Sequence, residues 1–134
     1  MKPVGLLSAV ILVLGAGILV LTEQGAAHAR LVRADPSPGA TVRTAPKMVR
    51  LWFKLSGVEE LDPQRSAVSV WDQRGKRVDD GKGGVDLDDL DRKSIIARLR
   101  PVGPGVYTVR WKAVSAPDGN VLQGRFQFTV AKGG

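Results

Sequence analysis

Apolar and polar residues alternate one by one in three long stretches of the chain. Residues 49–55, 107–113 and 126–130 place an apolar or aromatic residue at every second position, with mostly charged or polar residues between. A period of two is typical of a β-strand that buries one face and exposes the other. We therefore predict three half-buried strands in these ranges.

Shorter stretches extend the same pattern. Residues 68–70 end at a turn formed by Asp-Gln-Arg-Gly at 72–75, and residues 95–99 are followed by Gly-Pro-Gly at 103–105. Short candidates for edge strands are residues 31–32, 41–42 and 77–78. After Gln24 no stretch keeps a helical period over about ten residues. About seven short strands separated by turns predict an all-β fold, an antiparallel sandwich of two sheets.

The beginning of the chain has a different character. Lys2 is followed by 18 residues without a charge, residues 4–21, and then by a polar and small-residue segment. A positive start, an apolar run and small residues are typical of a secretory signal. The run is also long enough to cross a bilayer, so an uncleaved anchor remains an alternative. We expect residues 1–27 to be this signal or anchor and residues 28–134 to form an extracytoplasmic domain.

The position of the signal cleavage decides whether His28 stays in the exported protein. Cleavage after Ala27 would make His28 the new N-terminus, whereas cleavage after Ala29 would remove it. The small residues around it permit both cuts.

Composition excludes several classes of protein. The chain has no cysteine and a single histidine, which excludes disulfide scaffolds, thiolate metal sites, cysteine nucleophiles and any site needing two histidines. No Ser-His-Asp arrangement is indicated either, so we expect a protein that is not an enzyme. The net charge is +7. An exported chain without an aromatic-basic motif is not expected to bind nucleic acid.

Acidic residues gather in two predicted loops, residues 57–64 and 79–93. The Asp-Leu-Asp-Asp-Leu-Asp run in the second loop lacks the glycine and the final glutamate of an EF-hand calcium loop. The pattern favours a solvated, mobile acidic loop over a calcium site.

Several motifs, taken in order, resemble CopC-type copper-resistance domains. His-Ala-Arg-Leu at 28–31 and Pro-Ser-Pro-Gly-Ala at 36–40 are similar to the opening of that family. Pro-Gly-Val-Tyr-Thr-Val-Arg-Trp at 104–111, Val-Ser at 114–115 with Asp-Gly at 118–119, and Phe-Gln-Phe-Thr-Val at 126–130 are similar to its end. The resemblance implies an Ig-like Greek-key sandwich, in the periplasm or on the outer face of the membrane. It also implies Cu(II) carriage, together with a copper-transporting membrane protein as partner.

The family's metal site implies candidate ligands in this chain. His28 matches the N-terminal histidine, which binds through its amine and its ring, and Asp118 matches the aspartate of the family's Asp-Gly-His motif. Asn120 stands in place of that motif's histidine, and Leu55 stands where many members have a glutamate. Cu(II) prefers nitrogen and oxygen donors in a tetragonal arrangement, so His28 and Asp118 form an incomplete site.

Two other functions stay open. The sandwich can be a partner-binding or structural module that has lost its metal, as Asn120 and Leu55 suggest. Alternatively, basic residues in the N-terminal half can favour contact with an anionic membrane or a cell-surface polymer. These basic residues are Arg30, Arg33, Arg43, Lys47, Arg50 and Lys54.

Overall fold

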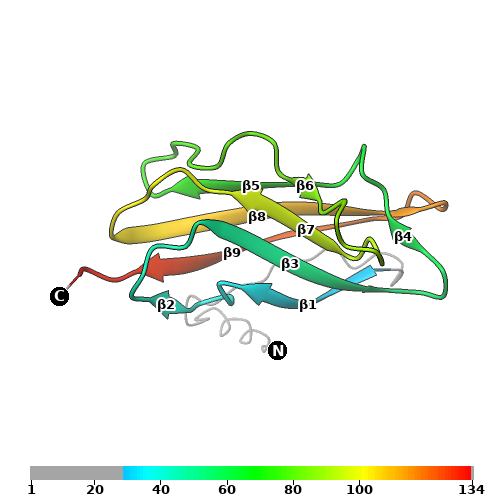
Figure 1. Ribbon diagram of the computed structural model, residues 1–134, viewed down its shortest axis with the longest axis horizontal. Coiled ribbons are helices and arrows are strands. Elements are labelled where there is room, and N and C mark those ends of the chain that lie inside the picture. The colour runs from blue at the N-terminus through cyan, green and yellow to red at the C-terminus, as the bar shows by residue number, and fades with distance from the viewer. Residues whose placement is uncertain (1–28, 134) are drawn as a thin grey trace, which may run out of the picture.

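The computed structural model describes residues 29–133 and shows two β-sheets packed face to face (Figure 1). This part of the chain contains nine strands and no helix. The strands are β1 (Ala29–Asp35), β2 (Thr41–Val42), β3 (Met48–Leu55), β4 (Glu60–Leu61), β5 (Ala67–Asp72), β6 (Gly84–Val85), β7 (Ser94–Arg98), β8 (Gly105–Ala116) and β9 (Val121–Val130). The predicted all-β sandwich is confirmed.

The chain crosses repeatedly between the two sheets. The first sheet has the order β1-β3-β7-β6, and the second has the order β2-β9-β8-β4, with β5 also paired to β8. The chain leaves β3 for β4 and β5, returns to β6 and β7, and crosses again to the β8–β9 hairpin. Such crossings between layers are the Greek-key arrangement.

The differences from the prediction lie in short segments. The structure adds β4 and β6, each of two residues, which is too short for a period of two to be visible. The predicted edge strand at 77–78 forms only a single bridge, between Arg77 and Trp71. The pair of β2 and β9 is parallel instead of antiparallel, which is possible because no hairpin joins these two strands.

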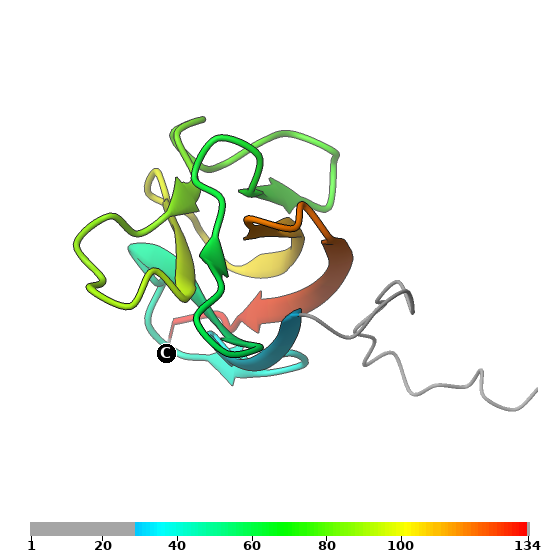
Figure 2. The same ribbon diagram turned by 90° about the vertical axis from the view of Figure 1, so that its right-hand side faces the viewer.

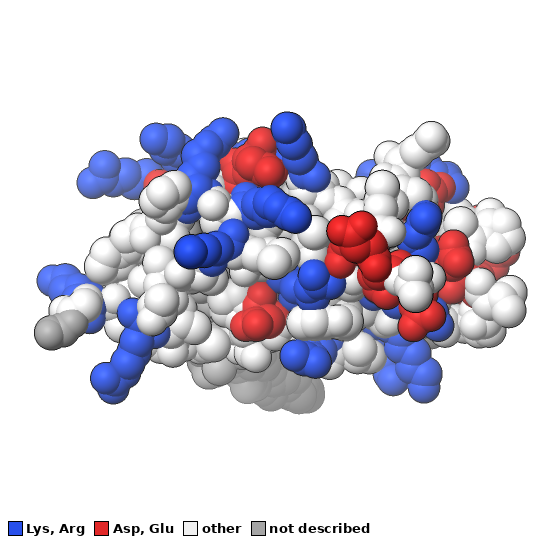
Figure 3. Space-filling model, viewed as in Figure 1, with Lys and Arg blue, Asp and Glu red and all other residues white. Residues whose placement is uncertain are grey.

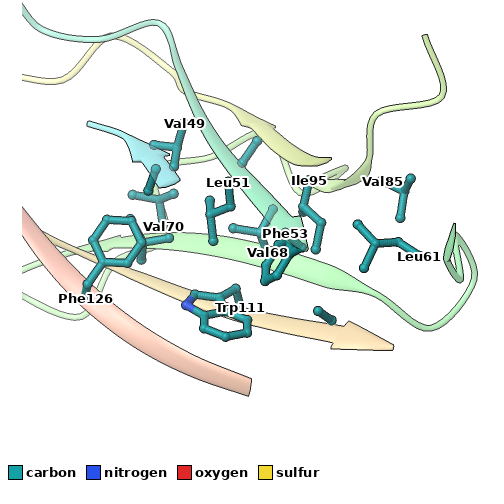
Figure 4. Close-up of a cluster of buried hydrophobic side chains, with 14 of the residues drawn as sticks. Val49, Leu51, Phe53, Leu61, Val68, Val70, Val85, Ile95, Trp111 and Phe126 are labelled. Atoms are coloured by element: carbon teal, nitrogen blue, oxygen red, sulfur yellow. The ribbon is translucent and has the colours of Figure 1, made fainter. Parts of the chain in front are cut away.

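The inward faces of both sheets build one core (Figure 4). Leu51, Val109 and Phe126 are fully buried, as their alternating positions predict. Phe53 of β3 meets Trp111 of β8 edge to face, with ring centroids 5.2 Å apart. Aromatic pairs of this geometry stabilise a core beyond the area that they bury, so this contact joins the two layers at their centre.

The predicted signal or anchor, residues 1–27, and His28 lie outside the described residues. The boundary between residues 27 and 28 is therefore still a prediction. Within residues 29–133 no helix is long and apolar enough to cross a membrane.

A buried carboxylate holds the segment that crosses from β5 to β6. The Asp79 side chain accepts hydrogen bonds from the backbone N–H of Val70 at 2.8 Å and of Gly81 at 2.7 Å. It also accepts the Arg77 Nε–H, at 2.9 Å. Asp79 itself bridges to Leu99, next to β7 in the other sheet. The carboxylate therefore closes the free edge of β5 and ties it to the crossing segment.

Burial of Asp79 corrects the expectation of a solvated loop, since this residue is only 1% exposed. Burial alone would raise the pKa of its carboxyl, but the hydrogen bonds from Arg77, Val70 and Gly81 outweigh burial and hold the pKa below its usual value. Asp79 therefore stays ionised in the folded protein at neutral pH.

We predict that Asp79→Ala destabilises the fold by about 3 kcal/mol, because two backbone donors and a guanidinium lose their buried acceptor. Because the pKa of Asp79 is lower in the folded chain, its stabilisation is complete above the pKa of the unfolded chain. This stabilisation is lost as the pH falls below about 4 towards the lower pKa of Asp79 in the folded chain.

Urea unfolding at several pH values measures both effects. Asp80→Ala, at an exposed neighbour, is the control and should cost less than about 1 kcal/mol. Equal losses for the two variants would contradict this role of Asp79.

Candidate functional site

The candidate site lies at one end of the sandwich. The start of β1, the end of β3, β4 and the β8–β9 turn meet at this end (Figures 1 and 2). Ala29, the first described residue, pairs with Leu55 of β3, and Glu60 of β4 pairs with Ala116 of β8. We call this end the β8–β9 pole.

Asp118 is exposed in the tight turn between β8 and β9. The turn is closed by two backbone hydrogen bonds, from Gly119 N–H to Ser115 O at 2.7 Å and from Ser115 N–H to Asn120 O at 3.0 Å. Gly119 has a φ of +77°, in the left-handed region that favours glycine. The Pro-Asp-Gly sequence thus presents the Asp118 carboxylate at the tip of a fixed turn.

Arg65 supports this turn from the neighbouring loop. A Cβ atom on Gly119 would lie 3.3 Å from an Arg65 Nη atom, so the guanidinium lies directly against the glycine. Arg65 Nε donates to Asp62 at 2.9 Å, and the Asp62 N–H donates to Val114 O at 2.7 Å. The side-chain bond from Arg65 and the N–H of Gln64 lower the pKa of Asp62. An anchored ion pair therefore positions the guanidinium over the turn.

The two positions where the family's ligands are absent have clear structural roles. Leu55 is buried in the core and pairs with Ala29. Asn120 is half-buried, and its backbone oxygen closes the turn. Ser115, next to them, is fully buried, and its hydroxyl has no hydrogen-bond partner in the described part of the chain. The apolar side chain of Leu55 extends the core to the place where the resemblance implies a carboxylate.

The described residues alone do not form a metal centre. Between residues 29 and 133 no group of three histidine, cysteine, aspartate or glutamate side chains could hold a metal ion. His28, the other candidate ligand, lies outside the described residues. Of the predicted pair, the structure therefore describes Asp118 only, at the same end of the sandwich as the start of β1.

The acidic segment near this pole is organised by its own carboxylates, which sequence reasoning missed. Asp86 is only 8% exposed, and its Oδ2 accepts a 2.7 Å bond from the Arg50 guanidinium. Asp89 accepts the hydroxyl of Ser94 at 2.8 Å and the N–H of Lys93 at 3.0 Å. These bonds engage the carboxylates of Asp86 and Asp89 inside the domain.

A local signal for these turns exists in the sequence. Asp86 accepts the N–H of Asp88, and Asp89 accepts the N–H of Asp91, each two residues further on. An aspartate that binds the backbone two residues later is a common turn former. The partner of Asp86, Arg50, comes from β3 and could not be assigned from local sequence.

A family comparison agrees with this architecture. The model of the CopC domain family matches residues 31–131. The chain belongs to the CopC domain family. The resemblance seen in the sequence motifs is confirmed.

Two solved structures of this family are similar to the chain. CopC from Methylosinus trichosporium OB3b shares 30% identity, with a TM-score of 0.66 over 78% of this chain and 95% of that one. PcoC, a methionine-rich copper resistance protein from Escherichia coli, shares 26% identity, with a TM-score of 0.62 over 78% of this chain and 99% of that one. In contrast to the description of PcoC, this sequence has only two methionines.

A curated relative is much longer than this chain. The copper transport protein CutJ of Bacillus subtilis (strain 168) is 28% identical over 116 residues, which are 86% of this chain and 20% of CutJ. The chain thus spans about a fifth of the length of that relative.

We predict that Gly119→Ala destabilises the CopC domain by about 1–2 kcal/mol, because alanine is strained at this φ and its Cβ presses on Arg65. Gly103→Ala is the matched control, since a Cβ there meets open space and the φ is not positive. This control should be neutral or slightly stabilising. Chemical denaturation compares the two, and a neutral Gly119→Ala would show that the turn is not constrained.

Proposed function

We propose that this chain is an exported copper-binding domain that carries Cu(II) outside the cytoplasm through a reduced site. Membership of the CopC domain family supports the metal, because relatives are described as copper resistance and copper transport proteins. The apolar run at 4–21 supports export. The observation that carries the proposal is the fixed turn that presents the Asp118 carboxylate at the pole where β1 begins.

The proposed site combines His28 with Asp118. If the signal is cleaved after Ala27, the α-amine and the imidazole of His28 form a chelate within one residue. Cu(II) favours such nitrogen donors together with a carboxylate oxygen. A free α-amine has a pKa of about 7.7–8.0, so binding at neutral pH displaces a proton and weakens as the pH falls.

We further propose that the domain exchanges copper with a membrane transport protein. This idea rests on CutJ, a copper transport protein in which the similar region is about a fifth of the length. A carrier needs to release its metal, and a site with fewer donors than the resemblance implies releases Cu(II) more readily.

A second candidate is a metal-free module that acts by binding a partner. Two observations favour it: Leu55 is buried in the core where many members have a glutamate, and Asn120 replaces a histidine. An asparagine amide is a weak Cu(II) donor compared with imidazole. The two candidates differ in whether His28 binds Cu(II).

We predict that His28→Ala weakens Cu(II) binding by at least about tenfold and reduces the nitrogen hyperfine structure of the electron spin resonance spectrum, because the imidazole nitrogen is lost while the α-amine stays. The mass of the exported protein first establishes whether His28 is its N-terminal residue. Asp118→Asn should weaken binding as well, while Asp80→Asn, in a loop between β5 and β6, is the matched control and should not. Identical Cu(II) titrations of the wild type and His28→Ala would overturn the copper proposal and favour the metal-free module.

We predict that Asn120→His strengthens Cu(II) binding by about tenfold or more, since it adds an imidazole donor two residues from Asp118. Because the Asn120 contact that closes the turn is made by the backbone, this substitution should leave the fold intact. Competition titration against a chelator measures the gain, and circular dichroism checks the fold. A gain that persists when His28 is also replaced by alanine would show that the two positions do not share one metal.

A further inference from the structure

The central part of the outer face of the second sheet, on β5, β8 and β9, is cationic and carries no carboxylate. Along β5, β8 and β9 the side chains between the buried ones point away from the core. The outward-pointing side chains in the central part of this face are Ser69, Trp71, Thr108, Arg110, Lys112, Gln123, Arg125 and Gln127. Three of these residues are positively charged and none is acidic.

A shallow trough opens on this face. Its volume is about 370 Å³, and it is lined by Arg77, Arg110 and Lys112 together with Ser69 and the backbone near Gly81. It therefore offers guanidinium and ammonium groups and a hydroxyl on one side of the sheet. These are the groups that bind phosphate oxygens.

The guanidinium groups of Arg77 and Arg110 both lie near the ring of Trp71. The Arg110 Cζ atom lies 5.2 Å and the Arg77 Cζ atom 5.9 Å from the centre of the Trp71 ring. A ring face attracts cations, so Trp71 favours positions of both arginines beside the trough. Arg77 is already paired with the buried Asp79, and the uncompensated charge comes mainly from Arg110, Lys112 and Arg125.

The pairing of β8 with β9 places like charges opposite each other. Arg110 is the direct cross-strand partner of Arg125, and on its other side it faces Ser69 of β5. Like charges in this position destabilise a sheet. No acidic side chain of the outer face separates them, so an anion placed between them would relieve the repulsion.

We propose that this face binds the phosphate groups of anionic membrane lipids. The cations are spread across β8 and β9 and beside β5, about 4.8 Å apart from strand to strand, which suits an extended surface of headgroups. The net charge of +7 and the predicted signal or anchor at 1–27 bring the domain to that surface. The proposal is independent of copper binding and locates the contact on the second sheet.

This location differs from the one that the N-terminal basic residues suggested. The Arg33 Cζ atom lies 4.1 Å from the centre of the Trp52 ring, and Arg50 is paired with Asp86. Asp86 therefore neutralises Arg50 on the first sheet, whereas Arg110 and Arg125 face each other on the second sheet.

The test measures binding of the exported protein to vesicles of phosphatidylcholine with and without phosphatidylglycerol. Once residues 1–27 are removed, we expect binding only to the vesicles that contain phosphatidylglycerol, since an uncleaved apolar run would insert into either bilayer. The binding should fall steeply between about 0.1 M and about 1 M salt, as the screening length drops from about 10 Å to about 3 Å. Arg110→Gln combined with Lys112→Gln should weaken binding by roughly 25-fold, at about fivefold for each cation near the surface.

Two control variants separate this site from a general effect of charge. Lys47→Gln with Lys54→Gln removes the same charge from the β2–β3 loop and the first sheet, and it should leave binding within about twofold of the wild type. Arg110→Lys keeps the charge and should keep the binding. Equal losses in the two double variants would overturn the proposal.

Inorganic phosphate is the competing small ligand. If millimolar phosphate alone shifts the tryptophan fluorescence and abolishes vesicle binding, the trough is a site for a free anion and the membrane proposal is wrong. Persistence of vesicle binding in phosphate supports the proposal. Circular dichroism of each variant confirms that a loss of binding is not a loss of fold.

Discussion

The backbone ladder of the β8–β9 hairpin is the constraint on which the described features of this domain depend. Its register pairs ten residues of β8 with ten of β9, from Gly105 with Val130 to Val114 with Val121. Because successive side chains point to opposite faces, this one register sends Trp111 and Phe126 into the core and Arg110 and Arg125 to the outside. The same ladder ends at the turn that carries Asp118. A slip of one residue in either strand would bury the arginine of that strand, expose its aromatic ring and alter the turn that carries Asp118.

The sheet layers could be predicted from sequence because burial on one face imposes a period of two. Residues 49–55 and 107–113 show that period and form β3 and most of β8. The buried carboxylates could not be predicted in the same way. Asp79 is stabilised by the N–H of Val70, and Asp86 by Arg50, 36 residues earlier in the chain. The local sequence around an aspartate in a turn is the same kind of sequence whether its side chain faces water or accepts a hydrogen bond from a distant strand.

The candidate metal site was predictable only in part, for a related reason. The Pro-Asp-Gly pattern locates the turn of Asp118, because glycine alone readily adopts the φ of +77° found at Gly119. The contribution of Arg65 was not predictable, since it depends on how the loop after β4 packs against that turn. Likewise, only the structure explains why a leucine stands at position 55, where the resemblance implies a glutamate. Leu55 closes the end of the core beside Ala29.

The distribution of charge along the molecule gives the two proposed contacts separate places. Figure 3 shows acidic side chains gathered toward the end that carries β4 and the β6–β7 loop, and basic side chains at the opposite end. Under the copper proposal, a cation approaching the β8–β9 pole meets the carboxylates of Glu60, Asp88 and Asp91 in addition to Asp118, while the Arg65 guanidinium over the turn opposes part of this attraction. Under the membrane proposal, these carboxylates would repel anionic lipid from the pole, while Arg110, Lys112 and Arg125 would attract it to the outer face of the second sheet. A domain held to a membrane by that face would therefore keep its metal-binding end free for a partner.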